Sequence, residues 1–433
     1  MSGDVIRNTR GKVHRPREHA AVRTGEYLFS QVIPYIGNKR KLLHLIARAV
    51  DFTGCESGTF VDLFTGSTVV ARWAKKSGYR VAANDWEPYS YELALGTVVP
   101  NVPPQYAELG GYEKVFELLN NLGPVHGYIA QHMCPADDEK PDIDRERMFF
   151  TRENGERIDA IREQVASWEA SGMLSAPERA YILASLIYAV SYASNTSGVF
   201  KGFHRGWGGQ TGTALYRIRG RLTLAPPVLY DNGRENLAFR EDAQSFSRSL
   251  PHNLGAVPEI VYIDPPYNQH PYGSNYHMLN TVTLWDKPDI TQHIVATGGE
   301  RNKSAIRTDW RTLRRSPYNH IGQAAEAFGK LIAHIQARWV LVSYSTDGTI
   351  KLGDLLTILA RRGQVTVFTE KYKRYRVSSQ RMSEKPHNVE FVAVLQPDTE
   401  ESTGRVEQMV ESILRHEAQA LNPRSGLAQE SLF

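Results

Sequence analysis

Residues 59–85 read TFVDLFTGSTVVARWAKKSGYRVAAND, and this stretch decides the fold. Thr59 to Phe64 is an apolar run typical of a buried strand, and it leads into the turn Thr65-Gly-Ser-Thr68. Val69 to Lys76 has helical spacing, and Gly78 to Asp85 is a second strand that ends on an acid. A strand, a helix and a strand in this order predict a parallel sheet.

The same alternation resumes after a long helical stretch. Further strands are expected at residues 237–242, 259–264, 339–344, 365–368 and 389–395. Between about 100 and 227 the strands stop and helical spacing takes over, with Ser175 and Glu178 forming a capping box. We therefore predict an α/β fold: a Rossmann-like sheet with helices on both faces and an inserted, mainly helical domain.

This pattern divides the chain into five parts. The expected parts are a disordered basic arm at 1–25, the first part of a catalytic domain at 26–100, the helical insertion at 101–230, the second part of the catalytic domain at 231–397, and a helix with a flexible tail at 398–433.

Composition excludes several protein classes. The 433 residues carry a formal charge of +4, and residues 1–24 account for it with six Arg or Lys against two acids. The body is nearly neutral, so a nucleic-acid partner has to be argued from local clusters. No apolar run is long enough to span a membrane, and Cys55 and Cys134 are too few for a disulfide framework or a metal site. We expect a cytoplasmic protein without a metal.

The tetrad Asp264-Pro-Pro-Tyr267 closes the apolar strand at 259–263 and carries the most specific chemistry. Asp264 and the carbonyl of Pro265 can accept both hydrogens of a planar amine, and Pro266 helps to fix the direction of that carbonyl. Tyr267 offers a stacking face for a single base. The simpler interpretation of the tetrad is a turn that ends a strand.

Other residues suit a nucleoside cofactor. Gly66 allows close backbone approach, and Asp85 lies where a carboxylate would bind ribose hydroxyls. Asp62 would repel a pyrophosphate but attract a cationic amino group. Upstream, Gly37 permits close approach and Lys39 could hold a carboxylate, whereas Asp242 could accept an amino hydrogen of adenine; the alternatives are a solvated helix start and a surface carboxylate.

Taken in order, these motifs resemble the Dam-like, alpha-class DNA adenine-N6 methyltransferases over residues 30–396. The resemblance implies methyl transfer from S-adenosylmethionine to the N6 amino group of an adenine flipped out of a specific double-stranded DNA sequence. It assigns cofactor contacts to Tyr35, Gly37, Lys39, Asp62, Phe64, Gly66, Asp85 and Asp242, and the insertion to target recognition. This chain departs from the family at Thr68, where many members have glycine, so this side chain must point away from the cofactor or donate to it.

Basic and aromatic clusters supply the DNA-contact candidates. The glycine-rich segment at 198–209 contains Lys201, Arg205 and Trp207, and a strand would place Arg217, Arg219 and Arg221 on one face. Arg307, Lys373 and Arg374 come from two later basic runs that we expect to contact phosphates. The alternative for the arginine row is an exposed strand edge.

The last residues suggest a partner. Gln429, Leu432 and Phe433 resemble the short peptide with which bacterial proteins dock on the sliding clamp, although a frayed terminus is an equal alternative. A cognate restriction nuclease is a second candidate partner, and the expected setting is bacterial or phage-encoded. The alternatives to DNA adenine methylation are an RNA adenine or protein glutamine-amide methyltransferase and a catalytically inactive DNA-binding relative.

Overall fold

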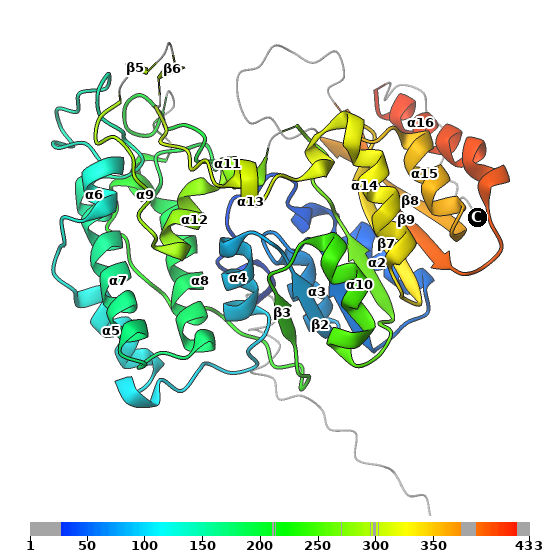
Figure 1. Ribbon diagram of the computed structural model, residues 1–433, viewed down its shortest axis with the longest axis horizontal. Coiled ribbons are helices and arrows are strands. Elements are labelled where there is room, and N and C mark those ends of the chain that lie inside the picture. Colours follow the sequence, from blue (N-terminus) through cyan, green and yellow to red (C-terminus); the bar gives the residue numbers. More distant parts are fainter. Residues whose placement is uncertain are drawn as a thin grey trace, which may run out of the picture.

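A computed structural model describes residues 27–209, 212, 214–269, 271–294, 296–297, 300–301, 303–373 and 387–421 of the chain. The expected arm at 1–25 lies outside them. The centre of the molecule is a seven-stranded sheet with the strand order β3-β2-β1-β4-β7-β9-β8 (Figure 1). Its strands are β1 (Thr59–Asp62), β2 (Arg80–Asn84), β3 (Leu237–Phe239), β4 (Ile260–Ile263), β7 (Trp339–Ser345), β8 (Gly363–Lys373) and β9 (His387–Pro397).

The sheet is parallel except at β9. The strands β3, β2, β1, β4 and β7 pair in parallel, whereas β9 runs antiparallel to both of its neighbours, β7 and β8. Strand order reverses between β1 and β4, because β2 and β3 extend to one side of β1 and β4 and β7 to the other. Such a switch point leaves a crevice at the carboxyl ends of the strands, where ligands bind in open α/β sheets.

Helices cover both faces of this sheet, as the alternation of its buried residues requires. Phe60 faces one hydrophobic core, together with α2 (Leu43–Phe52), α3 (Val69–Lys76) and the end of α4 (Pro88–Thr97). Val61 faces the opposite core. The helices of that second face are α10 (Ala243–Leu254), α14 (Ile321–His334), α15 (Leu352–Ala360) and α16 (Val406–Leu421).

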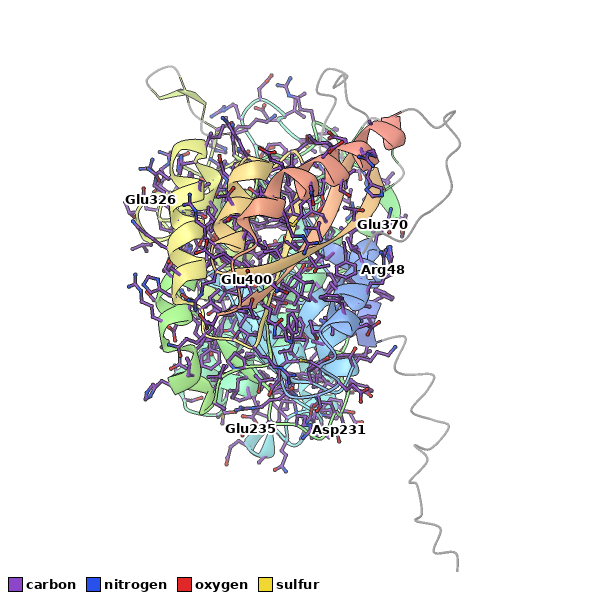
Figure 2. All side chains as sticks on the ribbon, turned by 90° about the vertical axis from the view of Figure 1, so that its right-hand side faces the viewer. Arg48, Asp231, Glu235, Glu326, Glu370 and Glu400 are labelled. Atoms are coloured by element: carbon purple, nitrogen blue, oxygen red, sulfur yellow. The ribbon has the colours of Figure 1, made fainter. Side chains whose placement is uncertain are left out.

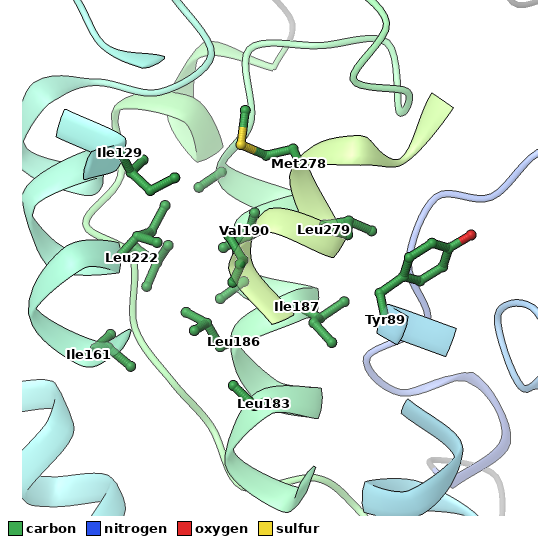
Figure 3. Close-up of a cluster of buried hydrophobic side chains, with 14 of the residues drawn as sticks. Tyr89, Ile129, Ile161, Leu183, Leu186, Ile187, Val190, Leu222, Met278 and Leu279 are labelled. Carbon is green, nitrogen blue, oxygen red and sulfur yellow. The ribbon is translucent and has the colours of Figure 1, made fainter. Parts of the chain in front are cut away.

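Residues 101–230 are mainly helical, and Figure 1 shows them beside the sheet. Their helices are α5 (Tyr112–Asn121), α6 (Tyr128–Met133), α7 (Arg152–Ala170), α8 (Ala176–Ala193) and α9 (Leu215–Arg219). The core of this region also takes in Tyr89 from α4 and Leu279 from α12 (His277–Leu284) (Figure 3). The helical region therefore shares its core with helices that belong to the sheet region.

Short elements complete the fold. They are α11 (Tyr272–Asn275), α13 (Trp310–Leu313), the 3-10 helices at Lys39–Leu42, Ala107–Leu109, Pro317–Asn319 and Thr403–Arg405, and a two-stranded sheet of β5 (Ala296–Thr297) and β6 (Glu300–Arg301). No helix in the described ranges is long and apolar enough to cross a membrane.

The structure confirms the Rossmann-like α/β architecture expected from the sequence, with helix α3 at the predicted residues. The capping box of Ser175 and Glu178 begins α8. The strand expected around Arg217, Arg219 and Arg221 is wrong. Residues 215–219 form helix α9, in which Ile218 is the buried side chain.

Candidate active site

Four adjacent strands bring acids to one edge of the sheet. Asp62 ends β1, Asp85 follows β2, Asp242 lies just beyond β3, and Asp264 follows β4. The parallel register aligns these strand ends, since Asp62 pairs with Ala83 on one side and with Tyr262 on the other. The acids therefore meet at the crevice of the switch point, although the tetrad and Asp62 are distant in sequence.

A pocket opens at this edge and brings together most of the predicted residues. Its lining includes the whole tetrad at 264–267, along with Tyr35, Gly37, Phe64, Asp85 and Asp242. Asp62, Gly66 and Lys39 are not part of its lining. Gly66 instead positions Asp85 of the lining, Asp62 binds Thr65 of the same turn, and Lys39 lines a second pocket that also includes Tyr267.

Gly66 lies where the chain passes closest to Tyr35. Its φ of 48° is left-handed, and a Cβ at this position would stand 2.7 Å from the Tyr35 ring. The Gly66 amide donates to Asp85 Oδ2 over 2.9 Å, and the Ser90 hydroxyl donates to the same oxygen. The glycine turn after β1 and the acid after β2 are thus tied into one wall of the pocket.

Tyrosines hold the turn at residues 35–37. The Tyr35 ring stacks on Tyr276 with centroids 4.8 Å apart, and the Tyr276 hydroxyl accepts from the Ile36 amide over 2.8 Å. Tyr272 donates to the Ile36 carbonyl over 3.0 Å. Tyr272 and Tyr276 belong to the segment after the tetrad, so this segment fixes the backbone at Gly37.

Asp62 is buried to 1% exposure beneath the pocket wall. Thr65 donates to its Oδ2 over 3.1 Å, whereas Oδ1 meets no hydrogen-bond partner among the described residues. Burial raises the pKa of Asp62 to about 7, against hydrogen bonds from Thr65 and the Ala71 backbone and together with repulsion from Asp264 and Asp85. A buried acceptor of this kind suits a cationic ligand group, because a cation would supply the missing partner and favour ionisation.

The structure shows where the side chain of Thr68 lies, the position at which this chain departs from the family pattern. It has a left-handed φ of 67°, is fully buried and does not line the pocket. Its hydroxyl has no hydrogen-bond partner within the described part of the chain. Thr68 therefore points away from the pocket, in a backbone conformation that favours glycine.

Asp242 has a structural task besides its place in the pocket lining. Its Oδ1 accepts from the amides of Gln244 and Ser245, which makes Asp242 the N-cap of α10. Capping fixes the direction of the carboxyl group at the pocket wall.

Lys39 joins the tetrad through its ammonium group. Its Nζ lies 3.0 Å from Asp264 Oδ1 and donates to the Tyr267 hydroxyl, also over 3.0 Å. Burial alone would lower the pKa of Lys39, but Asp264 and Glu390 outweigh burial and raise it above its ordinary value. Lys39 is thus paired with Asp264, and its expected contact with the cofactor stays a prediction.

Tyr267 lines both pockets, whereas Asp264 lines only the first. The second pocket is lined by Lys39, Asn268, Ser345, Asp347 and Glu390, and it shares Tyr35, Gly37, Tyr267 and Tyr272 with the first. The Tyr267 ring packs edge to face on Tyr344 at 5.3 Å. Burial raises the pKa of Asp264, and the Lys39 ammonium opposes this effect.

Sequence reasoning missed two buried acids at these pockets. Glu87 lines the first pocket and pairs with Arg314 over 3.4 Å, and Glu390 lines the second. Glu87 could have been found from the sequence, because it stands two residues after Asp85, which was predicted to lie at the carboxyl edge. Glu390 stands in an apolar strand, where its pattern indicates only core.

Most of the residues predicted to contact DNA bind other parts of the chain and do not line the pockets. Lys201 is exposed, Arg205 is exposed but pairs with Asp144 over 2.6 Å, and Trp207 donates to the Asp138 carbonyl. Arg217 donates to the Tyr192 carbonyl, Arg219 pairs with Glu139 over 3.0 Å, and Arg221 donates to the Asn120 carbonyl. Lys373 ends β8, and Arg374 lies outside the described residues, as do Gln429, Leu432 and Phe433.

Arg307 is placed against our expectation of a phosphate contact. It is 7% exposed, binds Asp286 through both terminal nitrogens at 2.6 and 2.7 Å, and pairs with Asp309 over 3.0 Å. Asp309 also binds Arg314, which in turn reaches Glu87. Arg307 is therefore part of an internal ion-pair network and not of an exposed phosphate-binding surface.

A Rossmann-like sheet with an antiparallel strand β9, an acid-rich carboxyl edge and this tetrad defines the methyltransferase class of α/β proteins. The sequence pattern of the D12 class N6 adenine-specific DNA methyltransferases matches residues 35–309. The chain belongs to this family.

Three relatives illustrate the match. Modification methylase StsI of Streptococcus sanguinis is 31% identical over 351 residues, covering 79% of this chain and 48% of that protein. Type II methyltransferase M.FokI of Planomicrobium okeanokoites is 30% identical over 84% of this chain and 52% of its own length. Type II methyltransferase M.NlaIII of Neisseria lactamica is 27% identical over 79% of this chain and 92% of its own length. The chain spans about half the length of the first two.

Proposed function

We propose that this protein transfers a methyl group from S-adenosylmethionine to the N6 amino group of an adenine flipped out of double-stranded DNA. One observation carries the proposal: Tyr267 lines two neighbouring pockets, and Asp264 of the first pocket lies 3.0 Å from the ammonium of Lys39, which lines the second. The first pocket has the carboxylates for a nucleoside with a cationic amino-acid end. The second has the Tyr267 face and the Lys39 ammonium for a base.

The residues that line or adjoin the first pocket fit the cofactor. Asp85 and Asp242 would hold the ribose and adenine, Asp62 would supply its unpartnered oxygen toward the ammonium end, and Gly37 and Gly66 leave the backbone close to the ligand. When bound, S-adenosylmethionine supplies an electrophilic methyl group on a sulfonium. Tyr35 and Phe64 would complete this wall.

Catalysis in this arrangement rests on alignment and charge. Asp264 and the Pro265 carbonyl accept hydrogen bonds from the adenine amine, so that its lone pair is freed from conjugation with the ring. Positive charge that develops on the nitrogen is stabilised by the Asp264 carboxylate. Tyr267 stacks on the base, which must leave the duplex at a cost of a few kcal/mol.

The helical region at 101–230, with its glycine-rich segment at 198–209, is the part of the chain that we propose to face DNA. Lys201, Arg205, Arg219 and Arg221 have exposed side chains there. Arginines already paired with acids can exchange these partners for phosphates, because exposed ion pairs contribute little. A clamp contact through residues 429–433, a cognate nuclease and a cytoplasmic location remain proposals of the same kind.

The test is expression in a host that lacks DNA methylation, followed by mapping of methylated bases in genomic DNA. The wild type should produce N6-methyladenine at one sequence motif, and Asp264→Ala should lose at least about a hundredfold in rate. Asp398→Asn is the matched control, because Asp398 is a 74% exposed carboxylate paired with Arg362. Absence of methyladenine with the wild type would overturn the proposal.

Two further measurements separate the alternatives. A catalytically inactive DNA-binding relative should not bind S-adenosylmethionine in equilibrium dialysis. An RNA or glutamine-amide methyltransferase would bind the cofactor but transfer tritiated methyl groups to RNA or protein and not to duplex DNA.

A further inference from the structure

A second buried carboxylate lies beside the Lys39 ammonium. Glu390 Oε2 is 4.0 Å from Lys39 Nζ, whose other neighbours, Asp264 Oδ1 and the Tyr267 hydroxyl, are each at 3.0 Å. The Lys39 and Glu390 side chains are 3% and 5% exposed. One ammonium therefore stands between two carboxylates at the boundary of the second pocket.

Glu390 has no evident reason to be in the core. It lies on β9 within the run Val389-Glu-Phe-Val-Ala393, opposite Ser345 of β7. The Ser345 hydroxyl is bonded to its carboxyl group, but Oε2 has no hydrogen-bond partner within the described residues. Burial of a carboxylate with an unsatisfied oxygen is costly, and an apolar residue here would make a more stable strand. The cost points to a functional use.

Its opposite neighbour on β8 makes a useful contrast. Glu370 pairs with Glu390 in the strand register, but its carboxylate faces outward to His44 at 3.0 Å and Arg48 at 4.0 Å. Figure 2 shows Arg48 and Glu370 close together on the outer side of the molecule. Of these two neighbouring acids, only Glu390 reaches Lys39.

We infer that Glu390 is a positioning residue for methyl transfer: it holds the Lys39 ammonium between two carboxylates, so that Asp264 remains an open acceptor for the adenine amine. Lys39 already lies 3.0 Å from Asp264 Oδ1; without the second anion its whole charge would act on Asp264 and compete more strongly with the amine for the carboxylate oxygens. This inference rests on the proposed function. It assigns to Glu390 an effect on the rate of transfer and not on cofactor binding, because Glu390 does not line the first pocket.

The charges around Glu390 make its state sensitive to pH. It faces Lys39 of the 3-10 helix at 39–42, Asp264 after β4, and Asp347 after β7, while Tyr262 of β4 faces the same ammonium. Burial raises the pKa of Glu390 to about 7, Lys39 opposes the rise, and Asp264 and Asp347 add to it. A proton taken up by Glu390 below this pH would strengthen the pairing of Lys39 with Asp264, so the transfer rate should fall on the acid side.

The experiment compares the wild type, Glu390→Gln and the control Glu370→Gln in transfer of tritiated methyl groups to duplex DNA from about pH 5.5 to about 8.5. We expect E390Q to lower kcat by about tenfold to a hundredfold, to leave KM for DNA and the Kd for S-adenosylmethionine within about twofold, and to lose the acid limb of the kcat profile near pH 7. E370Q should match the wild type.

Other outcomes are equally decisive. Wild-type kcat and an unchanged acid limb in E390Q would overturn the role of Glu390. A lowered Tm with weakened cofactor binding and an unchanged limb would assign Glu390 to the fold and overturn the inference as well. If E390Q does not fold, Glu390→Asp tests the role through kcat alone, since it keeps the titrating charge at shorter reach: kcat should fall with the acid limb retained, and a wild-type kcat would overturn the role of Glu390. An inactive wild type would instead overturn the proposed function.

Discussion

Charged side chains at the carboxyl edge of the sheet differ from those in the surrounding basic segments in how completely they are paired. At the edge, Asp62 and Glu390 are buried, and each has one oxygen without a hydrogen-bond partner among the described residues. In the basic segments, Arg205, Arg219 and Arg307 are already bound to Asp144, Glu139 and Asp286. A buried carboxylate with an unsatisfied oxygen costs stability and indicates a site for a ligand. A charge that is already paired indicates either a contact that stabilises the fold or a surface ion pair that can exchange its partner.

The largest expected effect tests whether Arg307 belongs to the fold. Arg307→Ala should lower the free energy of unfolding by about 3 kcal/mol, because it leaves Asp309 and Asp286 without their partner; the figure is at the low end since Asp286 is 46% exposed. Arg219→Ala should change it by less than about 0.5 kcal/mol. Urea unfolding measures both. Equal losses in the two variants would remove the distinction between internal and surface arginines.

The next effect concerns Asp62, the buried acid that ends β1. The pKa of Asp62 is raised to about 7, so ionisation of Asp62 opposes folding, and its contribution to stability falls as pH rises from about 4 to about 7. Binding of an ammonium group needs the ionised form. Affinity for S-adenosylmethionine should therefore fall about tenfold per pH unit below pH 7.

Asp62→Asn is the matched variant for this prediction, because it keeps the shape and removes the charge. Its affinity in equilibrium dialysis should be low and independent of pH, and at pH 8 its unliganded form should be at least as stable as the wild type. A slope equal to that of the wild type would show that another group controls binding.

A smaller effect is expected at Thr68. Its left-handed φ of 67° penalises any side chain with a Cβ, so Thr68→Gly should be more stable than Thr68→Ala by about 1 kcal/mol in urea unfolding. Both variants remove the unpartnered hydroxyl, so their difference isolates the backbone. Greater stability of the alanine variant would mean that packing, and not backbone conformation, decides this position.

The smallest effect concerns DNA. Arg219→Ala should reduce the slope of log affinity against log salt by about 1, because one phosphate contact is lost. Arg362→Ala is the control, since Arg362 is also paired with an acid, Asp398, but lies outside the proposed surface. An unchanged slope for Arg219→Ala in a filter-binding titration would exclude this arginine from the interface.

The sheet and its acids were predictable because burial and strand alternation are local signals. Asp62, Asp85, Asp242 and Asp264 each follow an apolar run, and parallel topology alone then brings them together. The helix at 215–219 was not predictable as such: in five residues with one buried side chain, helical and strand spacing look alike.

Partners that come from distant parts of the chain could not be predicted. Arg307 looks like a phosphate contact until Asp286 and Asp309 are seen to surround it. In the sequence, Glu390 is a charged residue within an apolar core strand, and only the structure shows that Lys39 lies beside it. In both cases the decisive fact is a tertiary contact, which local composition does not contain.

The place of β9 in the sheet has a consequence for synthesis. It is the last of the seven strands along the chain, yet it lies between β7 and β8, which the ribosome makes before it. A nascent chain that has released β8 but not β9 can form the cofactor side of the centre while the wall carrying Glu390 is still missing.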